Sequence, residues 1–455
     1  MRLIARYAKE LQDKFEIITV FDKDIKKEYT DKSNPKIKSL TKKYPSASWF
    51  ERKMSDDFGI MIEDTYDNRP LVHQERFPKN IHPMKKDFQQ KDIKEKDFTP
   101  YKYEEISGES VFQVPVGPIH AGIIEPGHFH FSQAGEGMLH LEVRHFYKYR
   151  GIEKMLEGKT LDEAKPIIER ISGNESIAYQ LCLRDIFLQA SKQTLPLSLQ
   201  KQHAFLLELE RVIHHLTDMG FIPNDAGFAA ALAYASKLAE DSRRKMKEFT
   251  GHRFGFGAIT FKSFSINVDK TEKWLNTLLE DIKFFQDWIM DIPSLWDRFD
   301  TTGELPQQKA LKYSTVGVVA RSSGVAIDTR NNTFYHKHGF QIAKQTSGDV
   351  SARFKLRIQE VINSIKMMKN FLTNDDTNLK LPTINDGEYK SFCESSIGEL
   401  FMSIDIKDGV IERFFVRDPS FVNWQALYIM MRKDIIADFP LINKSCDLSY
   451  AGNDL

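Results

Sequence analysis

Four long segments with helical periodicity constrain the fold of this chain more than any other feature. In Gln200–Met219 the apolar side chains of Phe205, Leu209, Val212 and Leu216 fall on one stripe of an α-helix. The same periodicity appears in three further segments, Asp225–Phe249, Lys270–Trp288 and Asp349–Phe371. Because each such helix must bury an apolar face, the four are expected to pack together as a bundle.

Strand-like patterns lie on both sides of these helices. Near the N-terminus, short β-like runs such as Phe15–Phe21 alternate with lysine-rich turns, and Asp56–Ile60 is interpreted as a turn that leads into another strand. Residues 110–141 are expected to form strands broken by glycines. Near the C-terminus, two apolar runs that flank Asp408-Gly409 indicate a β-hairpin.

These patterns divide the chain, which at 455 residues is too long for one ordinary core. We predict a small α+β module at residues 1–88 and a charged linker at residues 89–109. Residues 110–455 are predicted to form a mainly α domain, in which a long-helix bundle carries peripheral β strands.

Charge and cysteine content exclude several classes of protein. The 64 basic and 64 acidic side chains cancel, so nucleic acid is not expected as the main partner. Cys182, Cys393 and Cys446 show no CxxC spacing, so neither a disulfide framework nor an iron–sulfur site is expected within this chain, and a reducing compartment is the simple interpretation. No apolar run reaches the roughly 18 residues that a membrane span needs, and the first residues lack the pattern of a signal peptide.

The segment Gly117–Phe131 has the most unusual composition in the chain, with three glycines, two prolines, three histidines and one carboxylate. His128 and His130 would share one face of a strand and could ligate a metal, although backbone hydrogen bonding is the more common role of half-buried histidines. Glu125 could be a proton carrier, because desolvation raises a carboxyl pKa, or simply a turn residue.

Two further polar features lie within the expected helical region. His214-His215 sits beside an apolar stripe, and packing in the core with satisfied rings is the preferred interpretation. Arg321 lies among small residues, which suits either an anion or cofactor contact or a clamp on backbone carbonyls. Residue chemistry alone leaves these two roles of Arg321 open.

Short motifs along nearly the whole chain resemble a known family. Trp49–Arg52, Asp57–Ile60 and His82–Phe88 resemble the 30-kDa-type subunit of complex I. Gly117–Phe131 is similar to the opening motif of the large subunit of membrane-bound nickel–iron hydrogenases of the formate-hydrogenlyase type, and Tyr149–Lys154 resembles the motif that follows in both families. The further matches are Glu208-Leu209, Arg211, His215-Leu216, Thr250-Gly251, Arg253, Arg321–Gly324, Asp328, Arg330, Gly348-Asp349, Arg353 and Gly398-Glu399.

The resemblance implies where metal ligands would stand. In the hydrogenases two CxxC pairs supply four thiolates to nickel and iron, but here Ser172 stands at the first place, and Ser449 and Gly452 occupy the places of the second pair. A hydroxyl is a poor substitute for a thiolate on nickel, so no metal and no cofactor is expected on this chain. The quinone-binding tyrosine of the complex I branch is replaced by Gly173.

The resemblance also implies a role in a larger assembly. It suggests a peripheral-arm large subunit of a membrane-bound oxidoreductase, on the cytoplasmic face, that couples redox chemistry to proton translocation. The expected partners are an iron–sulfur small subunit that holds a 4Fe–4S cluster, a ferredoxin-like subunit and multi-spanning membrane subunits, with a quinone or another electron acceptor.

In such a subunit the former active-site cavity would remain. Glu125 is the expected proton-transfer residue and Arg321 an electrostatic contact to the acceptor. The other residues expected to line the cavity are His120, His128, Ser172, Gly173, Asp447 and Ser449. The alternative is a non-catalytic structural or coupling subunit whose cavity is filled by side chains, and a working hydrogenase is the least favoured interpretation. A solvent-reachable pocket that bears both Glu125 and Arg321 would favour the catalytic role.

Overall fold

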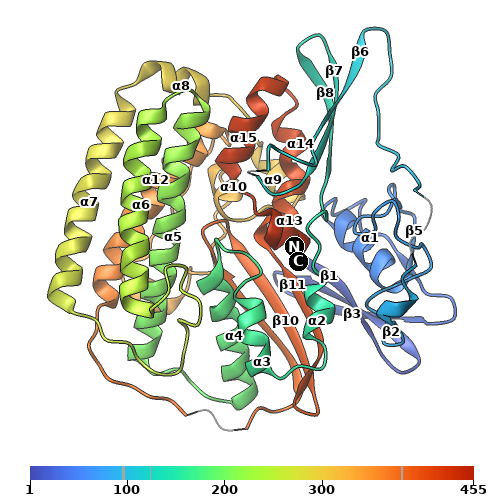
Figure 1. Ribbon diagram of the computed structural model, residues 1–455, viewed down its shortest axis with the longest axis horizontal. Coiled ribbons are helices and arrows are strands. Elements are labelled where there is room, and N and C mark those ends of the chain that lie inside the picture. The colour runs from blue at the N-terminus through green and yellow to red at the C-terminus, as the bar shows by residue number, and fades with distance from the viewer. Residues whose placement is uncertain (95–97, 123, 381–382) are drawn as a thin grey trace.

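The computed structural model describes residues 1–94, 98–122, 124–380 and 383–455. Ile123 of the unusual loop and residues 95–97 of the expected linker therefore lie outside the described residues. A bundle of long helices forms one side of the molecule and three small antiparallel sheets form the other (Figure 1). Among the described residues, no helix combines the length and the apolar composition that crossing a bilayer requires.

The N-terminal region is α+β, as predicted. Its antiparallel sheet has the order β1-β2-β3 and a parallel pair β4-β5 lies beside it. The elements are β1 (Leu3–Glu10), β2 (Lys14–Phe21), β3 (Ile25–Asp31), β4 (Lys36–Lys38), α1 (Ala47–Phe58) and β5 (Met61–Glu63).

One local prediction in this region is wrong. Residues 56–58 are the last turn of α1 rather than a turn between strands, although β5 does follow. Phe50, Met54 and Phe58 are buried and recur every four residues, which is the spacing of one helix face. Gly59 ends the helix in the left-handed conformation at φ 74°, and its N–H donates to the carbonyl of Ser55.

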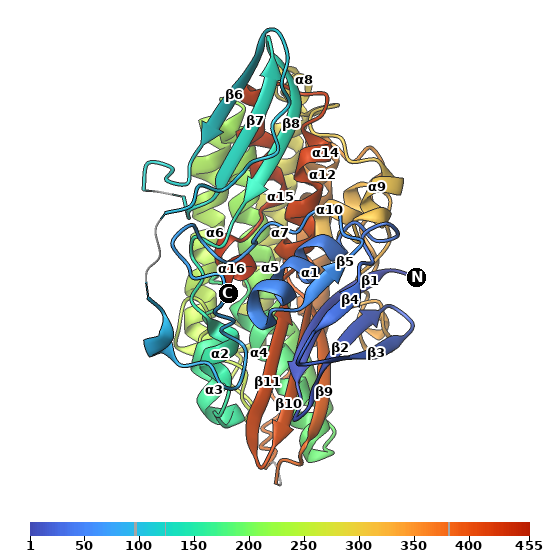
Figure 2. The ribbon, with the colours of Figure 1, turned by 90° about the vertical axis from the view of Figure 1, so that its right-hand side faces the viewer.

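The predicted strands around residues 110–141 are confirmed as a sheet of order β6-β7-β8 that projects from the body of the molecule (Figure 2). Its strands are β6 (Val111–Val116), β7 (His128–Ala134) and β8 (Gly137–Arg144). The long connection between β6 and β7 carries Glu125 and reaches the C-terminal segment of the chain.

The bundle is confirmed, with boundaries within a few residues of those expected. The central helix α5 packs against α6 and α12, and α7 packs against α12. The long helices are α4 (Ser176–Ser191), α5 (Leu197–Asp225), α6 (Ala229–Thr250), α7 (Val268–Met290) and α12 (Val350–Phe371). Shorter helices connect them, namely α2 (Ile152–Leu156), α3 (Leu161–Ile168), α8 (Pro293–Phe299), α9 (Gln307–Lys312), α10 (Gly317–Ser322) and α11 (Thr333–Lys337).

The predicted C-terminal hairpin is present as β10 and β11, with Asp408 and Gly409 at φ 53° and 76° in its turn. The sheet has the order β11-β10-β9, with β9 (Gly387–Glu394), β10 (Glu399–Lys407) and β11 (Val410–Arg417). After it come α13 (Pro419–Asn423), α14 (Leu427–Met430), α15 (Phe439–Cys446) and α16 (Tyr450–Asp454).

The N-terminal region shares one hydrophobic core with the rest of the chain. The rings of Tyr7 and Phe415 stack with centroids 4.2 Å apart, and the Tyr7 hydroxyl donates to Ser403 at 2.8 Å. Arg2 forms a bidentate ion pair with Glu399 on β10. These contacts dock the N-terminal sheet onto the C-terminal sheet.

Candidate functional site

Four segments that are distant in the sequence meet at the C-terminal end of the chain. The loop before β7, the segment after β8, the loop between α3 and α4, and helix α16 contribute to this place, which we call the α16 site. Glu125 accepts a hydrogen bond from the N–H of Ala451 at 2.9 Å. Arg150 donates to the carbonyls of Ile171 and Ala451, each at 2.8 Å, and so ties the α3–α4 loop to α16.

The two serines at expected cysteine places are in contact. The hydroxyl oxygens of Ser172 and Ser449 are 3.1 Å apart, although the residues are far apart in the sequence. Ser449 is also the N-cap of α16 and accepts from the N–H of Gly452 at 2.9 Å. The fold therefore brings together the segments that the resemblance assigns to the two CxxC pairs, with hydroxyls in place of thiols.

The space next to Gly452, the last expected cysteine position, is occupied by the carboxylate of Asp418. A Cβ atom built on Gly452 would lie 2.0 Å from Oδ2 of Asp418, so no side chain fits there while Asp418 keeps its position. Asp418 is held by the hydroxyl of Tyr179, which donates to Oδ2 at 2.8 Å, and by the N–H of Ser420, which donates to Oδ1 at 2.8 Å. The carboxylate oxygens of Asp418 thus occupy the place where the resemblance puts a cysteine thiolate.

Introducing the missing cysteine tests this packing. Gly452→Cys should lower the free energy of unfolding by about 1–3 kcal/mol, because the new side chain collides with Asp418. In a double-mutant cycle measured by chemical denaturation, Gly452→Cys should cost less in an Asp418→Ala background. Additive effects of the two substitutions would show that the close contact does not exist.

Glu125 lies at the surface of the α16 site. Its carboxylate pairs with the ammonium group of Lys148, and both side chains are a little more than one-third exposed. His120 and His128 support the same loop through the carbonyls of Gly127 and Gly117, at 2.7 and 3.2 Å. Backbone hydrogen bonding of His128 is thus observed, and burial lowers its pKa, which favours the neutral ring.

His130 shares the face of β7 with His128, as the strand periodicity predicts, with ring centroids 5.9 Å apart. Tyr103 stacks on His130 at 4.5 Å, and Glu105 approaches its Nε2 at 3.3 Å. Within residues 1–94, 98–122, 124–380 and 383–455, no group of three or more histidine, cysteine, aspartate or glutamate side chains is arranged to hold a metal ion.

Gly173 is exposed on the α3–α4 loop beside Ser172. A Cβ atom built there would meet no described atom within 4 Å. The loop therefore has open space where the resemblance places the quinone-binding tyrosine. Gly173 itself contributes backbone and no acid, base or stacking surface.

Asp447 lies apart from Glu125. It ends α15 in the left-handed conformation, and its buried Oδ2 lacks a hydrogen-bond partner among the described residues. Burial raises the pKa values of Asp447 and of the neighbouring Asp218, whose Oδ2 is 3.1 Å from Arg357. The structure thus places Asp447 against α5 and α12.

Arg321 belongs to a buried ion cluster between α5, α10, α12 and β9. Its guanidinium donates to Glu360 at 2.6 Å, to Glu394 at 2.6 Å and to the carbonyl of Ile327 at 3.0 Å. The charged side chains of this cluster are Glu208, Arg211, Arg321, Asp328, Arg330, Glu360 and Glu394. This geometry agrees with the clamp interpretation of Arg321 and does not bring it into a pocket with Glu125.

The histidine pair beside this cluster packs in the core, as preferred from the sequence, but Nε2 of His215 has no hydrogen-bond partner among the described residues, so its ring is not fully satisfied. His215 is fully buried, with its ring between Arg357 at 3.3 Å and Glu360 at 3.4 Å. Burial lowers the pKa of His215 well below its ordinary value, and the surrounding arginines add to this effect. Both effects favour the neutral ring.

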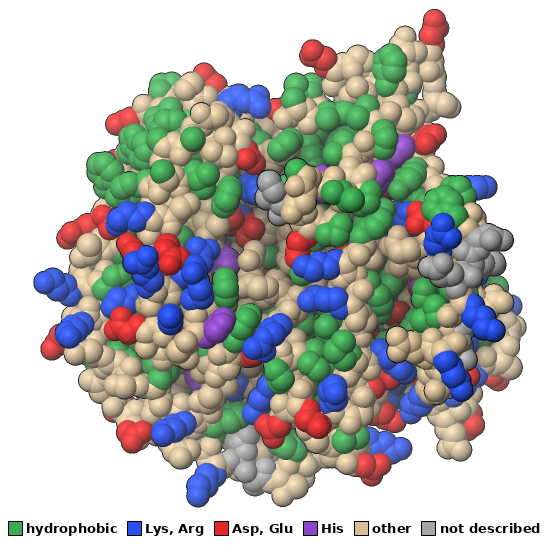
Figure 3. All heavy atoms as spheres, viewed as in Figure 1, with side chains coloured by type: hydrophobic (Ala, Val, Ile, Leu, Met, Phe, Trp, Pro, Cys, Tyr) green, Lys and Arg blue, Asp and Glu red, His purple; other side chains and the backbone are tan. Residues whose placement is uncertain are grey.

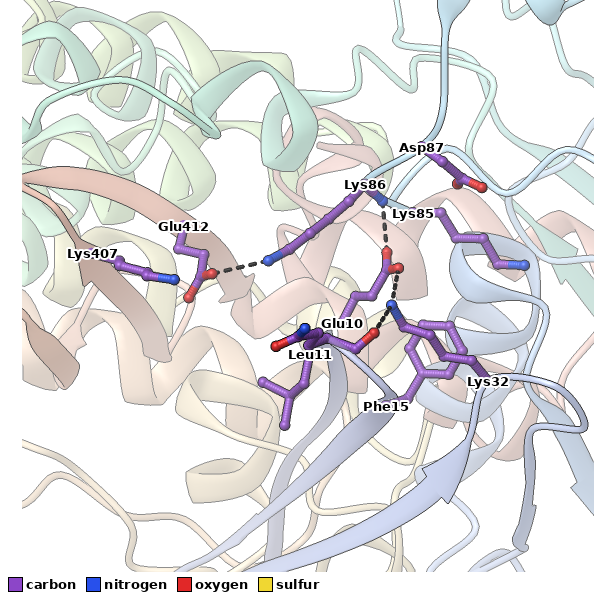
Figure 4. Close-up of a pocket in the computed structure, with 10 residues that line it drawn as sticks. Glu10, Leu11, Phe15, Lys32, Lys85, Lys86, Asp87, Lys407 and Glu412 are labelled. Carbon is purple, nitrogen blue, oxygen red and sulfur yellow. Dashed lines mark hydrogen bonds and ion pairs between the residues drawn. The ribbon is translucent and has the colours of Figure 1, made fainter.

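Two of the pockets outside the α16 site are lined by charged side chains that pair with one another. A pocket of about 270 Å³ is lined by Arg330 and Glu394 at the outer edge of the ion cluster. A polar pocket of about 760 Å³ lies where the β1–β2 turn meets the β10–β11 hairpin (Figure 4). In the second pocket Lys86 pairs with Glu412 at 2.9 Å and Lys32 with Glu10 at 2.7 Å, so its charges largely satisfy one another.

The sequence did not single out Asp418 or Lys148, and Tyr179 stood out only because Asn174-Glu175 followed by Tyr179 resembles the complex I branch. The pair Asp418-Pro419 indicates only the start of a helix, because an aspartate N-cap followed by proline is common there. No local pattern shows that this carboxylate faces α16. Tyr179 lies on a helix with buried residues around most of its circumference, so periodicity does not distinguish it from packing residues.

Known proteins resemble this chain over most of its length. Residues 3–94 match the family model of the respiratory-chain NADH dehydrogenase 30 kDa subunit, and residues 225–380 match that of the 49 kDa subunit. The chain is 26% identical over 445 residues to formate hydrogenlyase subunit 5 of Escherichia coli strain K12, covering 93% of this chain and 78% of that protein. It is also 26% identical to hydrogenase-4 component G of the same strain, covering 94% and 77%.

A solved structure extends the likeness. One chain in the structure of the membrane-bound sulfane sulfur reductase, an archaeal respiratory membrane complex, shares the fold with a TM-score of 0.68 at 19% identity, covering 76% of this chain and 99% of that one. The two family matches follow each other along one chain, in the order in which the motifs were found. The chain thus carries a segment similar to the complex I 30 kDa subunit ahead of a segment similar to the 49 kDa subunit, and most of its length is similar to formate hydrogenlyase subunit 5 and hydrogenase-4 component G.

Proposed function

We propose that this protein is the large peripheral subunit of a membrane-bound oxidoreductase related to complex I and hydrogenase-4, and that it works without a nickel centre. The observation that carries the proposal is the α16 site. Ser172 and Ser449 meet there at 3.1 Å, and Asp418 occupies the space that a side chain at Gly452 would need. This arrangement offers hydroxyl and carboxylate oxygens instead of the thiolates that would bind nickel.

The surface around the β6–β7 loop supports a role as a subunit. Large apolar side chains are exposed there, with Ile119 at 79%, Phe112 at 58%, Ile124 at 48% and Leu139 at 44%. Figure 3 shows hydrophobic side chains gathered over this part of the molecule. Exposed apolar groups of this size commonly mark a contact with another protein.

In the proposed assembly, an iron–sulfur small subunit with a 4Fe–4S cluster delivers electrons near the α16 site. A ferredoxin-like subunit passes electrons to that cluster. Multi-spanning membrane subunits contact the other side of this protein, which lies at the cytoplasmic face of the membrane. A quinone or another acceptor would be reduced beside Glu125, whose partly exposed carboxylate can exchange protons with solvent.

The second candidate is a non-catalytic coupling subunit, and the ion cluster around Arg321 favours it. This cluster is tightly packed, and Arg321 is already paired with Glu360 and Glu394, so it offers no free charge to a ligand. The two candidates differ at Glu125: a coupling subunit would tolerate its replacement, whereas a catalytic one would not.

Purification with an affinity tag tests the assembly. The tag belongs on the N-terminus, because Met1 is 60% exposed, whereas Leu455 is buried and its carbonyl accepts from the N–H of Arg150 at 2.6 Å. Gently solubilised membranes should yield an iron–sulfur subunit and multi-spanning proteins by mass spectrometry, with iron present and nickel far below stoichiometric. A lone monomer would refute the assembly, and stoichiometric nickel would refute the absence of a nickel centre.

A further inference from the structure

A pair of buried carboxyl groups lies directly behind the α16 site. Glu175 is fully buried at the start of α4, and its Oε1 accepts a hydrogen bond from the hydroxyl of Ser395. Its Oε2 is buried without a hydrogen-bond partner among the described residues. The carboxyl group of Asp418 is a neighbour of Glu175, because it accepts from Tyr179 one turn along α4, and its charge raises the pKa of Glu175. Two ionised carboxylates in contact would repel each other strongly in this enclosed place.

The hydrogen bonds of Asp418 indicate which group carries a proton. Its carboxylate already accepts from the hydroxyl of Tyr179 and from the N–H of Ser420, both at 2.8 Å, as an ionised carboxylate does. If Glu175 is protonated at Oε2, its O–H becomes a third donor to Asp418. Every buried oxygen of the pair is then satisfied.

Among the described residues, no cation replaces this proton. The positive charges that act on Tyr179 and Asp418, from a distance, are those of Arg150 and Arg417. Arg150 donates to three backbone carbonyls, and Arg417 pairs with Glu399. The remaining ionisable group that faces Glu175 is Glu210, which is itself an acid bonded to the N–H groups at the start of α4.

We propose that Glu175 and Asp418 form a proton-binding site in which one proton lies on Glu175 and is donated to Asp418. Asp418 packs against the backbone of Gly452, and the N–H of the preceding Ala451 binds Glu125, so the proton is held just behind the surface carboxylate, with α16 between them. For the proposed redox subunit, this site is a proton store next to the position where an acceptor is reduced. The role as a proton store rests on the proposed function, whereas the presence of a proton on Glu175 is independent of it.

The site makes a prediction for pH dependence. Burial raises the pKa of Glu175 well above its ordinary value, and the charge of Asp418 raises it further. The folded protein therefore binds this proton more tightly than the unfolded chain does, so the stability it contributes is present below the ordinary pKa of glutamate and declines as pH rises above it. Unfolding midpoints should fall less steeply with rising pH in Glu175→Gln than in the unaltered chain.

Infrared spectroscopy of the purified full-length chain tests the site directly. At neutral pH the carbonyl stretch of a protonated carboxylic acid should be present and should shift in heavy water. Glu175→Gln keeps the shape and a donor toward Asp418, and should remove one such band. Asp418→Asn should shift the band, because an amide accepts a weaker hydrogen bond than a carboxylate.

A matched control is Glu399→Gln, because Glu399 is as buried as Glu175 but pairs with Arg2 and Arg417, which keep it ionised. This variant should leave the acid bands unchanged. Burial also raises the pKa values of other carboxyl groups, such as Asp218 and Asp447, so the band is assigned to Glu175 by its loss in Glu175→Gln or, if that variant fails to fold, by its shift in Asp418→Asn. Absence of that band, its survival in Glu175→Gln, or its insensitivity to Asp418→Asn would overturn the proposal, whereas failure of the membrane purification would leave the bound proton intact.

Discussion

Replacing Arg321 with methionine should lower the free energy of unfolding by about 3–5 kcal/mol. Methionine keeps much of the side-chain volume but leaves Glu360 and Glu394 without the guanidinium that binds both of them at 2.6 Å. These carboxylates are fully enclosed, so water cannot replace the lost partner. Denaturation by urea, followed by far-UV circular dichroism, would measure the change.

Two further variants separate the lost charge from lost packing. Arg244→Met removes an arginine whose side chain is 74% exposed and pairs with Glu240 one helical turn away, and it should change stability by less than about 1 kcal/mol. Adding Glu394→Gln to Arg321→Met should recover part of the loss, because one uncompensated charge is removed. Equal losses for Arg321→Met and Arg244→Met would contradict the buried ion cluster.

Replacing Glu125 with glutamine should abolish turnover of the membrane complex without preventing its assembly. Glutamine can still accept from the N–H of Ala451, which lies 2.9 Å from Oε2, so the loop keeps its anchor while the acid is lost. The ion pair with Lys148 is more than one-third exposed, so its loss should cost less than about 1 kcal/mol of stability. Turnover would be followed as the rate at which reduced iron–sulfur clusters are reoxidised in native membrane vesicles.

The matched variants for this experiment are Lys148→Met and Glu136→Gln. Lys148→Met removes the same ion pair but keeps the carboxyl group, and it should retain most of the turnover. Glu136 is exposed in the turn between β7 and β8, and its replacement should have no effect. Full turnover in Glu125→Gln would exclude this residue from proton transfer and would favour the coupling role.

Local sequence patterns predicted much of the secondary structure. The stripe Phe205, Leu209, Val212 and Leu216 predicted α5, because a helix must bury a continuous apolar face. Asp408-Gly409 predicted the β10–β11 hairpin, because a two-residue turn between strands requires left-handed backbone conformations. The prediction of a turn at Asp56–Ile60 is wrong for residues 56–58, which end α1, because two aspartates followed by a glycine are typical both of turns and of the end of a helix.

The candidate site was only partly predictable. Similarity to the family located Ser172, Ser449 and Glu125, and the structure brings all three to α16. It also suggested that Arg321 and Asp447 would join them, but both side chains are enclosed elsewhere, Arg321 among acids and Asp447 beside Asp218. Similarity to a motif predicts which residues lie in one region of a fold. It does not predict the side of the helix or loop on which each side chain lies.

The sequence by itself determined the long helices, the hairpin, the order of the two fused segments and the absence of thiols at the expected cysteine places. Only the tertiary structure decided what occupies the space those thiols would have needed. Tyr179 and the N-cap Glu175 belong to α4 and Asp418 to the start of α13, and Asp418 meets Tyr179 and Gly452 only when α4, α13 and α16 pack together. The physical reason is that helix and turn formation depend on neighbouring residues, whereas the protonation of a buried carboxyl group depends on every group that the fold brings against it.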